Sequence, residues 1–171
     1  RDNPLAAQVL ASLAGNTAIA VAAAAAFSAL VASSAATIGV TLALASAGLL
    51  DLRGAVAIVL GANIGTCATA IMAAVGAGAE ARRVAAAHIG FKLGGVALVL
   101  PFIEPFTALV ARTAGDVARQ IANAHTFFNV GISLVFLPFA GLAARVIEAL
   151  IPADQPGENP FKTRYLDERS L

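Results

Sequence analysis

Two clusters of small polar side chains interrupt long apolar segments of this sequence. Each falls near the middle of a run without charged residues, over 3–50 and 54–79. In a membrane, hydroxyls and freed backbone carbonyls suit a hard cation such as Na+, and N–H groups at a helix start suit an anion. The clusters therefore predict one small polar site, formed by Ser33, Ser34 and Thr37 opposite Asn63, Thr66 and Thr69.

A simpler interpretation treats such hydroxyls as packing groups that bond to the carbonyl four residues earlier. We prefer it for Ser28, Ser46 and Ser133. For the two clusters we favour a binding role, because both fall at expected breaks in a helix, and broken helices at mid-membrane are a strong sequence indication of a transporter site.

The first uncharged run is long enough for two helices with a break between them. Helices over 16–32 and 36–50 would be about 25 and 22 Å long. The hydrocarbon core is about 30 Å thick, so each helix falls short of a full crossing. This favours a re-entrant hairpin with Ser33 and Ser34 at its tip, and two short full spans remain the alternative.

The second run carries its polar residues within GANIGTCATA, residues 61–70. Gly61 and Gly65 flank Asn63, and glycine is a weak helix former. At membrane depth, unwound backbone is tolerated where it is buried in protein or lines a cavity. We therefore predict a discontinuous transmembrane helix that is unwound over 61–66.

The composition indicates an all-α integral membrane protein. The 171 residues are 59% hydrophobic and 12% charged, with a mean hydropathy of +0.84. A soluble domain has about twice that charged fraction. The apolar runs are continuous rather than alternating, which argues against strands, and their length predicts membrane-spanning helices.

Several classes of protein are excluded by what the sequence lacks. The net charge is +1, Trp is absent and no basic patch occurs, so nucleic acid is not an expected partner. Cys67 is the single cysteine, which excludes an internal disulfide, and no transition metal is expected. No catalytic triad, zinc motif or phosphate-binding loop occurs, so we expect no enzyme and no cofactor apart from Na+ as a coupling ion.

Charged residues divide the chain into spans and surface segments. An interfacial segment is expected over 104–119, and spans are expected over 54–79, 84–103 and 120–147. Arg82, Arg83 and the polar tail then share one side. That side carries one more Lys or Arg than the other, so the positive-inside rule places the tail in the cytoplasm of a multi-pass protein of the cell (inner) membrane.

An internal repeat relates two of the expected spans, which should play related structural roles. The spacing places His88 and Lys92 on one helix face, and likewise His125 and Asn129. We interpret both histidines as packing residues rather than proton relays, since no acid is near in sequence. Lys92 must reach a partner, water or the interface, and snorkelling to the interface is its simplest interpretation. The matching segments, 37 residues apart, are AHIGFKLGGVALVLPF at 87–102 and AHTFFNVGISLVFLPF at 124–139.

Four segments resemble the type II sodium-dependent phosphate cotransporters and their bacterial relatives with a C-terminal PhoU-like domain. They are SSAATIGVTLALASAGLL, LGANIGTCATA, ARRVAAAHIGFK and AHTFFNVGISLVFLPF, within residues 13–150. The resemblance implies two inverted repeats, each with a hairpin and a broken helix, around a central phosphate and sodium site. This chain resembles the second repeat alone, so we expect the first repeat in the same, longer protein.

The resemblance also shows departures from the family's motif. The family's Gln-Ser-Ser-Ser-Ala-Thr corresponds here to ASSAAT at 32–37, which lacks the glutamine and the third serine. Cys67 stands where Thr is usual, and Lys92 stands where Asn is frequent. Phosphate is predicted to bind at Ser33, Ser34, Thr37, Asn63, Gly65 and Thr66, and Na+ at Ser34, Asn63, Thr66 and Thr69. Supporting roles are expected for His88, Lys92, His125 and Asn129.

The expected function is sodium-coupled transport of inorganic phosphate by alternating access, with import or export undecided. Residues 1–151 would form the transport domain and 152–171 a polar linker towards a cytoplasmic domain. Expected partners are phosphate, Na+, the lipid bilayer and the first repeat, and a homodimer is left open. The alternatives are a degenerate membrane scaffold without transport and a transporter of another small anion. A membrane-embedded enzyme ranks last, because no cluster of acid, base and nucleophile occurs at span depth.

Overall fold

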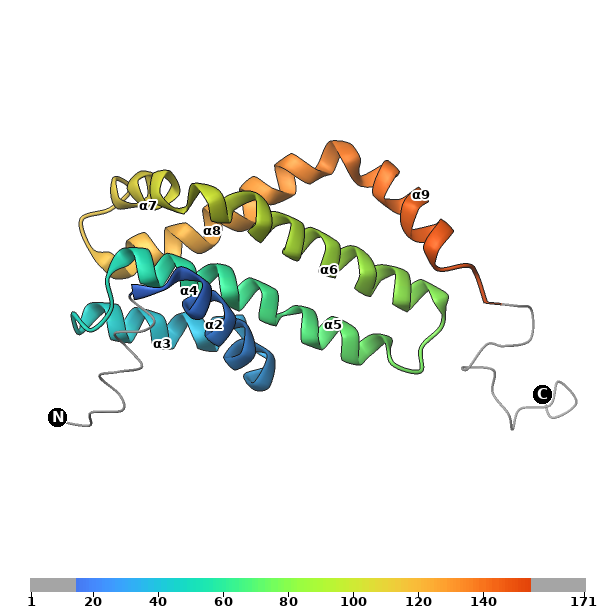
Figure 1. The fold of residues 1–171 in the computed structure, drawn as a ribbon, viewed down its shortest axis with the longest axis horizontal. Coiled ribbons are helices and arrows are strands. Elements are labelled where there is room, and N and C mark those ends of the chain that lie inside the picture. The colour runs from blue at the N-terminus through green and yellow to red at the C-terminus, as the bar shows by residue number, and fades with distance from the viewer. Residues whose placement is uncertain (1–14, 155–171) are drawn as a thin grey trace, which may run out of the picture.

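The computed structural model describes residues 15–154, and within them it contains helices and no strand (Figure 1). Arg1 and the predicted linker beyond residue 154 lie outside the described residues. Two 3₁₀ turns, η1 (Leu100–Phe102) and η2 (Leu137–Phe139), join α6 to α7 and α8 to α9. The helices are α2 (Thr17–Val31), α3 (Ser34–Ser46), α4 (Leu52–Gly65), α5 (Cys67–Ala74), α6 (Ala79–Val99), α7 (Ile103–Ala111), α8 (Val117–Phe136) and α9 (Ala140–Leu150).

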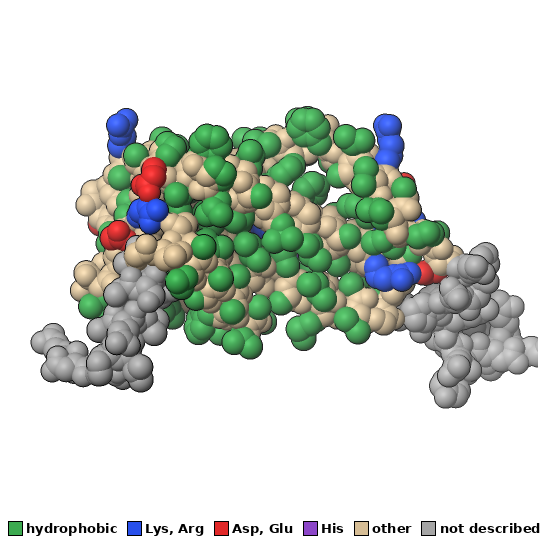
Figure 2. All heavy atoms as spheres, viewed as in Figure 1, with side chains coloured by type: hydrophobic (Ala, Val, Ile, Leu, Met, Phe, Trp, Pro, Cys, Tyr) green, Lys and Arg blue, Asp and Glu red, His purple; other side chains and the backbone are tan. Residues whose placement is uncertain are grey.

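Three helical segments within the described residues are long and apolar enough to cross a membrane. Charged side chains gather at the two ends of the molecule in Figure 2, and hydrophobic side chains cover the middle. This distribution fits a protein whose middle lies in the hydrocarbon core, and it confirms the prediction of an all-helical membrane protein. The three segments are Leu52–Ala74, Ala79–Ala111 and Val117–Leu150, with 23, 33 and 34 residues.

The predicted interfacial segment over 104–119 is mostly helical. The helix continues through η1 into α7, and only residues 112–116 are not helical. Pro101 and Pro138 lie in η1 and η2, where the proline ring removes a backbone donor and interrupts the α-helical hydrogen bonds. Both copies of the repeat therefore end in the same kind of turn, which confirms that they play related structural roles.

The helix α4 is the centre of the fold. It packs along α2 and also contacts α3, α6, α7 and α8. The backbones of α2 and α4 approach closely, because a Cβ at Gly61 would overlap Val21 O and a Cβ at Gly65 would lie 2.8 Å from Ser28 Oγ. The buried core includes Val56, Val59 and Leu60 of α4 with Ile121 and Phe128 of α8.

The break between α2 and α3 confirms a predicted feature. Ala32 ends α2 with a φ of 53°, in the left-handed region. Ser33 then begins α3, since its Oγ accepts a hydrogen bond from Ala36 N at 3.1 Å, which is the usual contact of a serine N-cap. The serine therefore fixes the corner through its side chain.

The break between α4 and α5 is shorter than predicted. The helix α4 continues through Gly65, and Thr66 alone separates it from α5. The prediction of unwound backbone over 61–66 is therefore wrong. The two glycines permit close packing against α2, and this packing outweighs their low helix propensity.

Three hydrogen bonds join the residues that follow α9 to the start of α6. Asp154 Oδ2 accepts a hydrogen bond from Ala79 N at 2.6 Å, and its Oδ1 accepts one from Arg82 Nη2 at 2.8 Å. Arg83 Nε donates to Ile151 O at 2.9 Å. The start of the predicted linker therefore lies beside Arg82 and Arg83, as the topology predicts.

Candidate functional site

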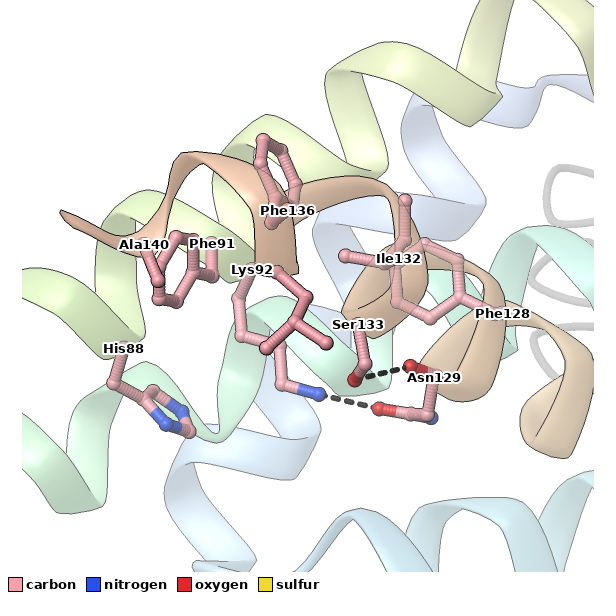
Figure 3. A pocket seen from close by; sticks show the side chains of 10 residues that line it. His88, Phe91, Lys92, Phe128, Asn129, Ile132, Ser133, Phe136 and Ala140 are labelled. Atoms are coloured by element: carbon pink, nitrogen blue, oxygen red, sulfur yellow. Dashed lines mark hydrogen bonds between the residues drawn. The ribbon is translucent and has the colours of Figure 1, made fainter. Parts of the chain in front are cut away.

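Lys92 of α6 lies between two side-chain amides from other helices. Its Nζ donates to Asn63 Oδ1 of α4 at 2.8 Å and to Asn129 Oδ1 of α8 at 2.5 Å, the second of which is drawn in Figure 3. The lysine binds protein partners, so the interpretation that it snorkels to the interface is wrong. Its ammonium joins α4, α6 and α8 at one point.

Both asparagines are held so that their amide oxygens face the lysine. Asn63 Nδ2 donates to Val59 O at 2.9 Å, and Asn129 Nδ2 donates to His125 O at 2.8 Å, in each case to a carbonyl four residues earlier. Asn63 is 1% exposed. An amide whose N–H side is bound to its own helix presents its oxygen, which is the acceptor that a cation requires.

Thr66, at the break between α4 and α5, extends this polar cluster. Its Oγ1 donates to Asn63 O at 2.7 Å and lies 3.2 Å from His88 Nε2. Because Thr66 Oγ1 directs its proton to Asn63 O, it can accept from the histidine, and the contact fits the tautomer whose proton is on Nε2. The exposed Thr69 donates to Thr66 O at 2.8 Å, so the predicted residues of this second cluster lie together in the structure.

A cavity of about 310 Å³ opens beside the lysine, between α6 and α8 (Figure 3). Apolar walls with a few convergent polar groups are typical of small-ligand sites. Among residues 15–154, no group of three or more His, Cys, Asp and Glu side chains could hold a metal ion. The polar lining is His88, Lys92, Asn129 and Ser133, and the aromatic lining is Phe91, Phe128 and Phe136.

The first cluster is placed at the corner between α2 and α3, where its hydroxyls serve local contacts. Ser33 Oγ caps α3, and Thr37 Oγ1 donates to Ser33 O at 3.1 Å. Ser34 is partly buried and makes no side-chain hydrogen bond to another described residue. Within the described part of the chain, no hydrogen bond joins this cluster directly to Asn63 or Thr66.

Ser28 connects the corner between α2 and α3 to α4, and sequence reasoning missed this role. Its Oγ donates to Ala62 O at 3.1 Å across the α2–α4 contact, and its backbone O accepts from Ser33 N at 3.2 Å. The interpretation that this hydroxyl bonds four residues earlier in its own helix is therefore wrong, although it holds for Ser133. The close spacing of Gly61 and Gly65 was the available signal, because it requires a small residue opposite.

The two histidines of the repeat differ in their contacts. His88 touches Thr66 and lines the cavity, so it belongs to the candidate site. The His125 ring makes no hydrogen bond to another described residue, and the backbone carbonyl of His125 instead orients Asn129. The contact with Thr66 is compatible with the packing interpretation of His88, and that interpretation stays a prediction for both histidines.

These features define an all-helical membrane protein with a polar site where α4, α6 and α8 meet. The chain belongs to the Na+/Pi-cotransporter family, which it matches over residues 3–143. It is 41% identical over 125 residues to the "Uncharacterized protein YqeW" of Bacillus subtilis, covering 73% of this chain and 41% of that protein. It is 31% identical over 139 residues to the "Putative inorganic phosphate export protein YjbB" of Salmonella typhimurium, covering 81% of this chain and 26% of that protein. The chain thus spans less than half the length of either relative, and no solved structure matches it.

Proposed function

We propose that this chain forms half of a sodium-coupled transporter of inorganic phosphate that works by alternating access. Two findings support the proposal: the family to which the chain belongs, and the name of the Salmonella relative, which refers to inorganic phosphate export. The other half would be an inverted repeat of the same protein that closes the open side of the cavity. The site would lie near the middle of the cell membrane, with the linker in the cytoplasm.

The observation that carries the proposal is the lysine-centred cluster within apolar helices. A cation in the spanning part of a membrane protein is costly, and such residues usually belong to a substrate or ion pathway. Phosphate at neutral pH is an anion that accepts several hydrogen bonds, and the Lys92 ammonium uses only two of its three donors on the amides. The Thr66 hydroxyl and the His88 imidazole would donate as well once they turn from their present partners. The cluster consists of Asn63, Thr66, His88, Lys92 and Asn129.

We assign the corner between α2 and α3 to the same phosphate site. These helices have 15 and 13 residues, hence lengths of about 22 and 20 Å, and neither crosses the hydrocarbon core alone. A re-entrant hairpin would bring Ser33, Ser34 and Thr37 to the depth of the second cluster. The contacts of Ser28 with Ala62 and with the backbone of Ser33 support this placement.

Na+ would bind beside the phosphate as a transported ion. Its ligands would be oxygen atoms of the helix break, where hydroxyls and backbone carbonyls suit a hard cation. Residues 1–151 would form the transport domain and 152–171 the linker towards a cytoplasmic domain. Gly65 is assigned to the phosphate site. The residues assigned to Na+ are Ser34, Asn63, Thr66 and Thr69.

The test is phosphate flux in proteoliposomes that hold the complete gene product. Flux with an imposed Na+ gradient should exceed flux with K+ in its place. Ser34→Ala and Asn63→Ala should each raise the phosphate KM about tenfold or more, since losing a hydrogen bond to a charged group costs about 1.5–3 kcal/mol. The matched control is Ser46→Ala, an exposed serine at the end of α3 that makes no side-chain hydrogen bond to another described residue.

The outcomes separate the alternatives. Equal flux in Na+ and K+ would contradict sodium coupling and leave phosphate transport intact. Flux of sulfate in preference to phosphate would favour a transporter of another anion. No flux of either from folded protein would favour a scaffold, and gradients imposed in each direction distinguish import from export.

A further inference from the structure

Lys92 is held by neutral oxygen atoms alone. It lies nine residues beyond Arg83 in α6, about 14 Å along the helix axis from that end of the molecule. No carboxylate among residues 15–154 pairs with it, and its positive charge is therefore stabilised by two amide dipoles. The ion pairs of the described residues are Arg53–Glu104, Arg82–Asp154 and Arg83–Glu80.

The two amide oxygens are ligands that a hard metal ion would also use. Amide and carbonyl oxygens bind hard cations in proteins, including the coupling ions of transporters. Asn63 and Asn129 come from different helices, and each amide is fixed by a bond to its own backbone. The lysine ammonium, a compact point charge, occupies the position between them where Na+ would join the same two helices.

The internal repeat gives an independent argument. Lys92 and Asn129 occupy equivalent positions of the two copies, 37 residues apart, so a lysine stands where the other copy has an asparagine. With asparagine at both positions, three amides would converge between α4, α6 and α8 and no fixed cation would lie among them. The lysine thus adds a charge to a set of ligands that is otherwise neutral.

We propose that the Lys92 ammonium replaces one transported Na+ between Asn63 and Asn129 and reduces by one the sodium ions needed for each phosphate. An ammonium has three donors, of which two are bound to the amides. The third is available to an anion in the adjoining cavity, which Lys92 lines. This inference rests on the proposed function for the phosphate, and the cation position can be tested without it.

The first test compares wild type with Lys92→Asn and Lys92→Gln in proteoliposomes of the complete gene product. Phosphate flux is measured against Na+ concentration, with choline keeping the ionic strength constant. Both variants should need more Na+, with a Hill coefficient for Na+ higher by about one than that of wild type, because the two vacated amides and the new side-chain oxygen together bind an additional ion. Lys92→Met, which offers no oxygen, should raise the phosphate KM without that increase.

The second test measures binding of Na+ between the two asparagines, in detergent and without phosphate. Purified Lys92→Asn should gain an apparent Tm shift of about 3 °C when NaCl at ten times its Kd replaces choline chloride, beyond any shift of wild type. If Lys92→Asn folds in NaCl but not in choline chloride, this also supports the proposal, because folding then depends on bound Na+.

The proposal is overturned if both variants show the Na+ response of wild type, or if neither folds at any Na+ concentration, since the amides then hold no metal ion. Absence of phosphate flux in wild type would contradict the proposed function, and the thermal shift would still decide the cation position.

Discussion

Thr66 joins two parts of the candidate site through one hydroxyl, which donates to Asn63 O and contacts His88. We expect Thr66→Val to raise the phosphate KM about tenfold, because the isosteric side chain leaves the His88 imidazole without its partner and removes a hydroxyl that could turn to donate to the anion. The measurement is phosphate flux at saturating Na+.

The matched control for this change is Thr126→Val in α8. Its exposed hydroxyl also donates to a backbone carbonyl of its own helix, Ala122 O at 3.1 Å. It makes no other hydrogen bond to a described residue. A similar loss in both variants would show that the effect is structural and would contradict a binding role for Thr66.

Sequence reasoning singled out the residues that meet in the polar cluster, but not their contacts. Asn63, Thr66, His88, Lys92 and Asn129 could be selected because polar groups are costly in apolar helices. Which of them meet depends on how α4, α6 and α8 pack, and that packing has no local signal. The lysine was therefore expected at the interface, although its partners lie 29 and 37 residues away in sequence.

At the scale of elements, the contact between α2 and α4 depends on glycine. We expect Gly61→Ala to destabilise the protein by about 1–3 kcal/mol, because the added methyl would overlap Val21 O, and backbone cannot move aside as a side chain can. Thermal or denaturant unfolding in detergent measures the change.

Gly90→Ala in α6 provides the matched control. Nothing lies within 4 Å of a Cβ at that position, so the gain in helix propensity should make this variant equal to wild type or up to about 1 kcal/mol more stable. If Gly61→Ala were as stable as Gly90→Ala, the close approach of the two helices would be wrong.

The elements themselves were largely predictable. The polar residues from 33 predicted the break between the first two helices, although α3 begins at Ser34, earlier than the predicted 36, because Ser33 caps it. The internal repeat predicted related roles for α6 and α8, and both continue into a Leu-Pro-Phe turn. Gly61 and Gly65 misled, because low helix propensity and the need for close packing favour the same residue. Only the position of α2 distinguishes the two causes, and the local sequence does not contain it.

At the scale of the whole molecule, Asp154 connects the segment that follows α9 to the first turn of α6 through hydrogen bonds. We expect Asp154→Ala to speed hydrogen exchange of the Ala79 amide about fivefold, because losing a capping side chain costs about 1 kcal/mol. The bond to Arg82 is lost at the same time. Exchange measured by mass spectrometry over 75–82 tests this.

Glu148→Ala is the control for this prediction. Glu148 is exposed on α9 and makes no hydrogen bond or ion pair with another described residue, so exchange over 75–82 should stay as in wild type. Unchanged exchange in Asp154→Ala would show that the start of α6 is held without the carboxylate.

The charge positions predicted that Arg82 and Arg83 share a side with the linker, and the contacts of both arginines with residues 151 and 154 agree with this. The length of the last two helical segments did not follow. Their extension beyond the predicted spans passes through proline-containing turns, and a proline in the sequence is equally compatible with a helix that ends and one that bends.

The glycine contact between α2 and α4 also has a mechanical consequence. Because the two backbones are in direct contact, we expect α2 and α4, with Asn63, to move as one body. A displacement of Ser33 relative to that body would then require α3 to shift on α4 and the backbone to rotate at Ala32, the left-handed residue between α2 and α3.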